Sequence, residues 1–367
     1  MRDQRADALA QILVHYSTRV REGDVCVIQS TSAAEVLVQA IYEEVLRAGG
    51  LPVMQLTTDG AAAAFFDLAS DAQLDWVAPP SQWAAEHADV RIAVMADENT
   101  RALSQADPKQ QARAQRARKD LLETSMRRSA AGEHRWALTL FPTHAYAAEA
   151  GMSLRDYEAF YYAACLANDG EPLTAWRRQS EEVKRLTEWA QGKQEVRITG
   201  PGTDITLGVA GRTWIACAGE HNMPDGEFFT GPLEDSVNGE VAFSFPASYG
   251  GREVAGVRFR FQDGRVVDAS ADRGEEFLIE MLDTDEGSRV LGELGIGTNY
   301  GIATGTKEIL LDEKIGGTVH MAIGMSYPET GGVNSSAVHW DMVCDLRHGG
   351  AIEVDGVALQ RDGRFLV

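Results

Sequence analysis

The first half of the chain has the apolar pattern of strands that alternate with helices. Four short apolar runs predict strands, at residues 25–29, 52–56, 91–96 and 136–140. After the first run, apolar residues recur at helical spacing from Leu37 onward. Ser32, with Glu35 three residues later, is a capping-box pattern for the start of this helix, and Gly49-Gly50 predicts its end.

Further helices follow in the same half of the chain. Their helical spacing or helix-prone composition places them at residues 61–87, 108–128, 153–166 and 174–191. Because strands that alternate with helices pair in parallel, we expect an α/β N-terminal domain with a parallel sheet and flanking helices. A nucleotide cofactor is not indicated here, since Ser30–Ala34 contains neither a GxGxxG motif nor a Walker lysine.

After Lys193 the pattern changes to short strands separated by glycine-rich turns. Residues 196–198 and 205–207 are apolar and flank Gly200-Pro201-Gly202, which predicts a hairpin. The 367 residues also exceed the roughly 250–300 at which a single core stops growing. We therefore expect two domains: residues 1–192, which end in a helical linker, and residues 193–367, an α+β domain.

Two strands of this second domain carry histidines on polar faces. In the segment 318–324, a period of two puts His320 on the same face as Ala322 and Gly324, with apolar residues on the other face. In the segment 337–344, the same period puts His339 and Asp341 together, opposite another apolar face. An imidazole and a carboxylate two residues apart on one strand can reach the same cation. A hydrogen-bonded core pair is the structural alternative, but two such strands in one domain favour a metal site.

Two carboxylates lie in settings that local structure does not require. Glu227 follows the turn Asn222–Gly226 and leads into an apolar segment. Glu293 lies in a stretch with three glycines, residues 291–299, where we expect a loop whose backbone can crowd around a single acid. Taken alone, each has an ordinary alternative: Glu227 as a surface charge at a strand start, and Glu293 as a solvated turn residue.

Composition narrows the classes of function. Hydrophobic residues make up 44% and charged residues 24%, as in an ordinary globular protein. The net charge of -21 repels phosphate backbones and anionic lipid, so we expect neither nucleic acid nor membrane as a partner. No signal peptide or apolar run of about 18 residues is found, and we expect a cytoplasmic protein. The four cysteines form no CxxC pair, which predicts reduced thiols.

Five separated motifs, in order, resemble those of the aminopeptidase T and aminopeptidase S family of metalloaminopeptidases. They are Asn222–Glu227, Glu293–Asn299, Glu313–His320, Ser326–Gly332 and His339–Asp341. The resemblance is close over the second domain, whereas the first half matches mainly in its α/β arrangement.

The resemblance implies a dinuclear metalloaminopeptidase. Carried over by position, the metal ligands are Glu227, Glu293, His320, Tyr327, His339 and Asp341. It also implies a pair of divalent ions, with zinc first and cobalt or magnesium as alternatives. The implied substrates are peptides with a free N-terminus, and the implied assembly is a homodimer.

Three carboxylates and two histidines suit two divalent cations with one carboxylate as a bridge. We expect Glu293 to bridge, and the ions to hold the substrate's amine, acidify a water and polarise the scissile carbonyl. Tyr327 is expected to ligate a metal or to stabilise the oxyanion. Glu313 is a further carboxylate that could serve as a general base.

Two other functions compete with the peptidase. His320, His339 and Asp341 alone would suit a mononuclear non-haem iron ring-cleaving dioxygenase, and dihydroxypyridine dioxygenases look similar over these motifs. Glu227 and Glu293 argue against it, because a mononuclear site needs no two additional acids. The third reading is a non-catalytic metal-binding module, but no ligand position of the motifs is lost.

Overall fold

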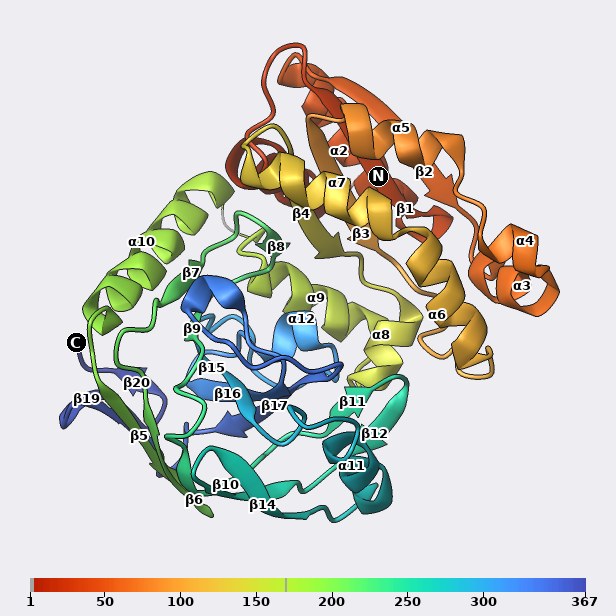
Figure 1. Ribbon diagram of the computed structural model, residues 1–367. Coiled ribbons are helices and arrows are strands. Elements are labelled where there is room, and N and C mark those ends of the chain that lie inside the picture. Colours follow the sequence, from red (N-terminus) through yellow and green to blue (C-terminus); the bar gives the residue numbers. More distant parts are fainter. Residues whose placement is uncertain (1–2, 169) are drawn as a thin grey trace. The chain divides into compact units, whose positions relative to one another are not determined.

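The computed structural model describes residues 3–168 and 170–367, which form two compact units (Figure 1). The first contains the chain up to Trp176 together with Gly219–Pro224. The second contains Arg177–Ala218 and Asp225–Val367. Two segments differ from the predicted ranges, because most of helix α10 (Pro172–Ala190) groups with the second unit and Gly219–Pro224 with the first.

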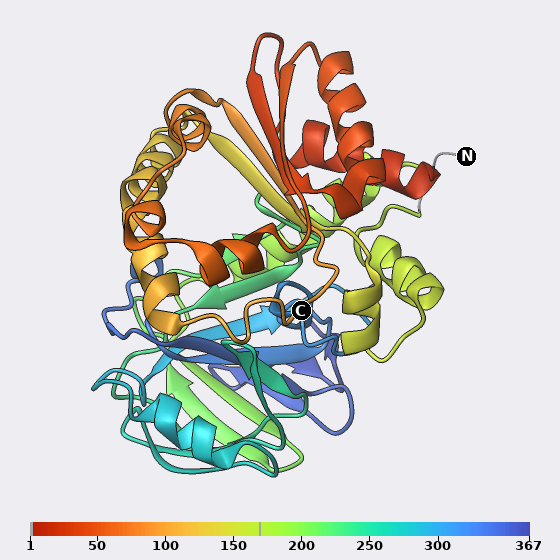
Figure 2. The ribbon, with the colours of Figure 1, turned by 90° about the vertical axis from the view of Figure 1, so that its right-hand side faces the viewer.

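The first unit is built on one parallel sheet, as predicted. Its strand order is β2 (Leu51–Thr57), β1 (Val25–Thr31), β3 (Val90–Met95), β4 (Arg135–Leu140) and β8 (Asn222–Met223). Every neighbouring pair is parallel. Figure 2 shows these strands with helices on both sides, so the predicted α/β class is confirmed. The short strand β8 was not predicted, since two residues leave no periodic signal.

Eleven helical segments besides α10 are described in the first unit, most of them at the predicted positions. They are α1 (Gln4–Gln11), the π-helix Ile12–Ser17, the 3-10 turn Ser32–Ala34, α2 (Glu35–Arg47), α3 (Ala61–Leu68), α4 (Asp71–Leu74), α5 (Pro79–His87), α6 (Pro108–Ala117), α7 (Lys119–Ala130), α8 (His144–Glu149) and α9 (Leu154–Ala164). The first two and α8 were not predicted. Among the described residues, no helix combines the length and the apolar character needed to cross a membrane.

Two details of the predicted helices are wrong. The helix start after β1 uses Thr31, whose side chain accepts the N–H of Ala33, because a 3-10 turn precedes α2 and Ser32 lies inside it. The predicted helix 108–128 is divided at Arg118, whose backbone leaves the helical region and separates α6 from α7.

The second unit contains a large antiparallel sheet. Its strand order is β14 (Arg265–Ser270), β13 (Arg258–Gln262), β10 (Asn238–Ala242), β6 (Thr203–Gly208), β5 (Glu195–Gly200), β18 (Ala351–Val354), β19 (Val357–Arg361) and β20 (Arg364–Phe365). The predicted hairpin is formed by β5 and β6. Gly202, with a φ of +71°, supplies the left-handed residue that this tight turn requires.

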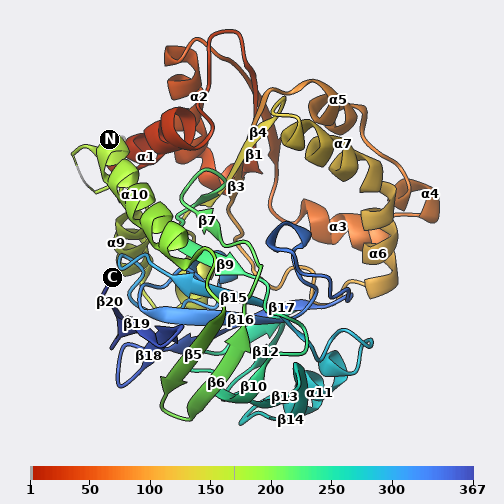
Figure 3. The same cartoon turned by 60° about the vertical axis from the view of Figure 1, so that its left-hand side comes forward.

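A second, five-stranded antiparallel sheet carries the predicted site segments. Its order is β17 (His339–Asp345), β16 (Thr318–Gly324), β15 (Leu291–Gly297), β9 (Glu227–Thr230) and β7 (Ile215–Cys217). Figure 3 shows β9, β15, β16 and β17 side by side. The remaining elements are the hairpin β11 (Ala247–Tyr249) and β12 (Arg252–Val254), helices α11 (Glu275–Leu282) and α12 (Ile309–Asp312), and the 3-10 turn Pro328–Thr330.

One apolar core joins both sheets of the second unit with α10. It includes the alternate residues of β16 and β17 that the period of two assigned to the apolar faces, namely Val319, Met321, Ile323, Trp340, Met342 and Cys344. These predicted faces are therefore confirmed. Because one face of the five-stranded sheet lies in the core, the polar residues at the alternate positions share the opposite face.

Candidate metal centre

The strand register places five of the six predicted site residues on one face of the five-stranded sheet. Residues directly opposite each other in an antiparallel pair point to the same side. The opposed pairs are Glu227 with Gly297, His320 with Gly295, Glu293 with Ala322, Asp341 with Ala322, and His339 with Gly324. Each acidic or histidine side chain thus has glycine or alanine opposite it on at least one neighbouring strand, which leaves space above the sheet; Val343 and Cys217 lie opposite His320 and Glu227 on the other side.

The glycine-rich stretch of Glu293 is a central strand, β15, and the prediction of a loop is wrong. Its glycines do not form turns; they allow neighbouring groups to approach the strand closely. A β-carbon on Gly295 would lie 1.9 Å from Cε1 of His320, and one on Gly297 would lie 2.1 Å from the carbonyl oxygen of Ile315. Only glycine therefore allows the imidazole of His320 to lie flat against the neighbouring strand.

A first group of side chains that could hold a metal ion consists of Glu227, Glu313 and His320. One potential ligand atom from each lies within 4.8 Å of the others. Nε2 of His320 is 3.6 Å from Oε2 of Glu227. That oxygen is buried and has no hydrogen-bond partner. A buried carboxylate oxygen without a partner is costly, and a cation would satisfy it.

A second group consists of Glu293, His339 and Asp341. Nε2 of His339 is 3.4 Å from Oε2 of Glu293 and 3.5 Å from Oδ2 of Asp341. The other oxygen of Glu293, Oε1, is 3.3 Å from Nε2 of His320. Glu293 therefore stands between the two groups and presents one oxygen to each histidine.

Backbone carbonyls orient both imidazoles. Nδ1 of His320 is 3.0 Å from the carbonyl oxygen of Glu313, and Nδ1 of His339 is 2.9 Å from that of Met325. Since a carbonyl only accepts, each Nδ1 carries the proton and donates it. Nε2 is therefore the ring nitrogen that faces the carboxylates, as in a metal-ligating histidine.

Tyr327 reaches the second group with its ring. The ring centroid lies 5.1 Å from that of His339 and 5.5 Å from that of Phe229, both in edge-on contacts. Burial raises the pKa of the Tyr327 hydroxyl, and the charges of Glu293 and Asp341 raise it further. The hydroxyl therefore stays protonated and can act as a neutral hydrogen-bond donor.

Lys314 is a site residue that sequence reasoning missed. Its side chain is 0% exposed, and Nζ lies 3.3 Å from Oε1 of Glu227 and 4.0 Å from Oδ1 of Asp225. It also forms an ion pair with Glu313. The sequence offered one signal, which is that Lys314 lies inside the motif Glu313–His320.

Burial and crowding perturb the acids and bases of the site. Burial raises the pKa of Glu227 to about 8, although Lys314 opposes the shift. Burial also raises the pKa of Asp341 to about 6, and the charge of Glu293 adds to this. For His320, burial lowers the pKa, but the charges of Glu227 and Glu293 outweigh it and raise the pKa to about 10.

These shifts have one common meaning: the site is rich in negative charge and short of positive charge. Its two groups together contain four carboxylates, against one lysine. Carboxylate oxygens and imidazole nitrogens are the donors that zinc and similar divalent ions accept. The donor set, the two Nε2 atoms that face carboxylates and the unpartnered oxygen of Glu227 therefore fit divalent cations.

A cavity of about 300 Å³ adjoins the second group. It is lined by His339 and Asp341 of β17, by the β11 segment around Tyr249, and by Lys307 and Ile309 ahead of and within α12. The side chains at its wall are mixed in character, with aromatic, aliphatic and charged groups. A small organic molecule in this cavity would therefore lie directly beside two of the candidate ligands.

Comparison with known sequences shows aminopeptidases over most or all of the chain. Aminopeptidase T of Thermus thermophilus is 27% identical over an alignment of 406 positions, which covers 98% of this chain and 98% of that protein. Aminopeptidase 2 of Geobacillus stearothermophilus is 31% identical over an alignment of 297 positions, which covers 71% of this chain and 70% of that protein.

Comparison with solved structures gives the same relationship. Wild-type AmpT from Thermus thermophilus superposes with a TM-score of 0.83 at 26% identity, over 99% of both chains. The 2,5-dihydroxypyridine dioxygenase from Pseudomonas putida KT2440 has a TM-score of 0.61 at 14% identity and shares the fold alone. The family described as thermophilic metalloprotease (M29) matches residues 2–365. With five motifs in order, and with this match over nearly its whole length, the chain belongs to the M29 family of metalloproteases.

Proposed function

We propose that this protein is an aminopeptidase that removes the N-terminal residue of peptides with the help of two divalent metal ions. One observation carries the proposal. Two three-residue groups of ligand side chains lie next to each other, and Glu293 faces both histidines with separate oxygens, 3.3 Å and 3.4 Å away. A single ion would not need two separate groups of ligands.

In the proposed site, Glu227, Glu313 and His320 would hold one ion, and His339 and Asp341 would hold the other. Glu293 would contribute to both, because its two oxygens face different groups. Tyr327 is a further ligand or an active-site donor. We propose zinc as the metal, with cobalt or magnesium as alternatives, because two imidazoles accompany the oxygen donors.

When bound, the ions would supply Lewis-acid polarisation of the scissile carbonyl and lower the pKa of a water between them. The protein's own side chains orient the ligands and stabilise the charge that develops on the substrate. Glu293 keeps both histidines facing the reaction site, and the neutral hydroxyl of Tyr327 can donate a hydrogen bond to the carbonyl oxygen as negative charge develops there. Glu313 is held in an ion pair by Lys314, which makes it a poor general base.

The substrate in this proposal binds through its free amine. The partly exposed carboxylate of Asp341 in the second group suits a cationic or metal-held amine, and the cavity beside His339 and Asp341 can take up a side chain of the peptide. Blocking the amine by acetylation removes its charge and its lone pair. An N-acetylated peptide should therefore bind poorly and stay uncleaved.

The dioxygenase reading is disfavoured by the grouping of the ligands. A two-histidine, one-carboxylate site needs His320, His339 and Asp341 around one iron. In the structure, His320 belongs with Glu227 and Glu313, while His339 and Asp341 belong with Glu293. The likeness to the dihydroxypyridine dioxygenase, at 14% identity, reflects a shared fold.

A homodimer and a cytoplasmic location are also part of the proposal. Both rest on the resemblance of the motifs to the family and on the composition of the chain. Sedimentation of the purified protein and fractionation of the cells that produce it test them separately.

The central experiment measures metal content and substrate range together. Protein purified without chelator should contain about two non-iron divalent ions per chain by mass spectrometry of the elements. It should release the first residue of unblocked peptides and leave their N-acetylated versions intact. One iron per chain, or equal rates on free and blocked peptides, would remove the basis of the proposal.

A further inference from the structure

Lys314 contacts only one of the two ligand groups. Its ammonium lies 3.3 Å from Glu227, forms an ion pair with Glu313 and lies 4.0 Å from Asp225. Glu227 and Glu313 belong to the first group, with His320. None of these ion-pair partners belongs to the second group. The positive charge of Lys314 is therefore placed at one end of the site.

The position of Lys314 is fixed by its backbone. Its N–H donates to the carbonyl of Leu311, and its carbonyl accepts the N–H of Asn299 at the end of β15. The Asn299 side chain in turn donates to the carbonyl of Asp225. Because the side chain of Lys314 is 0% exposed, the ammonium cannot move into water when an ion arrives. The ammonium of Lys314 therefore remains in the site as a fixed positive charge.

The two groups therefore differ in net charge, although their ligands are alike. Each contains two carboxylates and one histidine. In the first group the ammonium offsets part of the carboxylate charge, and it would repel a divalent ion bound there. In the second group, among the described residues, the ligands pair with His320 and His339, which are themselves candidate ligands, and with no lysine or arginine. Charges a few ångströms apart in a buried site interact strongly.

We propose that Lys314 makes the two cation sites unequal, so that the site of Glu293, His339 and Asp341 fills first and the site of Glu227, Glu313 and His320 binds its ion more weakly. The inference rests on the proposed two-metal function. When the weak site is empty, Lys314 compensates the charge of the buried Glu227 and of the partly buried Glu313. Lys314 thus allows the second ion to exchange without unfolding the site.

The test is a calorimetric titration of the metal-stripped, full-length protein with Zn²⁺ alone. The wild type should bind in two steps whose dissociation constants differ by at least about tenfold, given the strength of a nearby buried charge. Lys314→Met should tighten the weak step by a similar factor and leave the tight step unchanged. Lys314→Arg, which keeps the charge, should retain two unequal steps.

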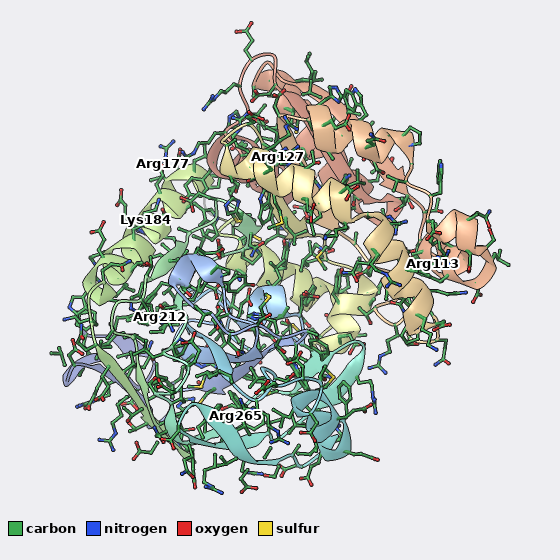
Figure 4. All side chains as sticks on the ribbon, viewed as in Figure 1. Arg113, Arg127, Arg177, Lys184, Arg212 and Arg265 are labelled. Atoms are coloured by element: carbon green, nitrogen blue, oxygen red, sulfur yellow. The ribbon has the colours of Figure 1, made fainter. Side chains whose placement is uncertain are left out.

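A matched control comes from the same unit. Lys184 is an exposed residue of α10 (Figure 4), so Lys184→Met removes the charge of a solvent-exposed lysine. It should bind zinc like the wild type. Two equal steps in the wild type, or a weak step that Lys314→Met leaves unchanged or weakens further, would overturn the inference.

A second pair of variants keeps the inference testable if Lys314→Met does not fold. Glu227→Gln should remove the weak step and keep the tight one, whereas Asp341→Asn should remove the tight step. The reverse assignment would overturn the inference. Peptide hydrolysis separates this result from the proposed function: two unequal ions without hydrolysis contradict the peptidase alone, and a single ion in the wild type contradicts both.

Discussion

Gly295 faces His320 across the β15–β16 pair with no room for a methyl group between them. Gly295→Ala would bring its β-carbon to 1.9 Å from the ring. The imidazole would have to turn away from Glu227 and Glu293. We expect metal content and peptidase activity to fall together, with a loss of stability of about 1–3 kcal/mol from overpacking.

The control for Gly295→Ala lies on the other face of the sheet. Ile323→Val shortens a core residue of β16 and should cost about 0.5–1.5 kcal/mol while leaving both ions bound. Elemental analysis, urea denaturation and peptide hydrolysis measured on both variants make the comparison. Normal metal content in Gly295→Ala would show that the close approach to His320 has no bearing on the site.

Replacing the central carboxylate should affect both ions. Glu293→Gln keeps the shape but removes the charge that faces His320 and His339. We expect bound metal to fall from about two ions per chain to one or fewer, and kcat/KM to fall at least about a hundredfold. Glu276→Gln, at an exposed position on α11, is the matched control and should behave as wild type. Two ions and normal turnover in Glu293→Gln would exclude it as the bridge.

The two faces of β17 should separate metal binding from stability. His339→Ala and Asp341→Ala should lower metal content and abolish turnover while the fold remains, because the core face of the strand is untouched. Trp340→Ala, on the core face, should instead destabilise the protein by about 3–5 kcal/mol and keep the ligands. Thermal unfolding of metal-free protein and elemental analysis would reveal the opposite pattern if the faces were wrongly assigned.

Asp285 should make the second unit sensitive to acid. Its carboxylate accepts hydrogen bonds from the N–H of Ala337 at 2.7 Å and from Ser336 and Ser288. The N–H of Ala337, ahead of these hydroxyls, lowers the pKa of Asp285 to about 2 against a smaller opposing effect of burial. Its contribution to stability is therefore complete above the unfolded pKa of about 4 and is lost as the pH falls from about 4 toward 2.

Asp285→Asn tests this dependence, because an amide does not titrate. The difference in free energy of unfolding between wild type and variant should be largest near pH 6 and should shrink steadily below pH 4. Urea denaturation of metal-free protein at several pH values measures it. A constant difference down to pH 3 would mean that Asp285 titrates as in the unfolded chain.

The sequence predicted those parts of the site that local periodicity controls. His320, His339 and Asp341 were placed correctly because the apolar residues between them, such as Trp340, must face the core. The strand that carries Glu293 was mistaken for a loop, since its glycines serve a neighbouring ring rather than a turn. A single-sequence pattern does not contain that contact between strands.

Lys314 and the grouping of Gly219–Pro224 with the first unit escaped prediction for a related reason. The three acids around Lys314 come from positions 225, 227 and 313, and only the fold of the second unit brings them together. Likewise, the return of Gly219–Pro224 to the first unit rests on a two-residue strand pairing with β4. Both features depend on long-range contacts, which hydrophobic spacing does not report.

The carbonyl groups that hold the two imidazoles belong to Glu313, five residues before β16, and to Met325, directly after it. Any amino acid at position 325 would provide the same carbonyl, so the residue there can be substituted during evolution without changing the orientation of His339. Sequence comparison alone would then rank this position as unimportant. The path of the main chain, rather than the identity of a residue, is what natural selection or a protein engineer would have to preserve there.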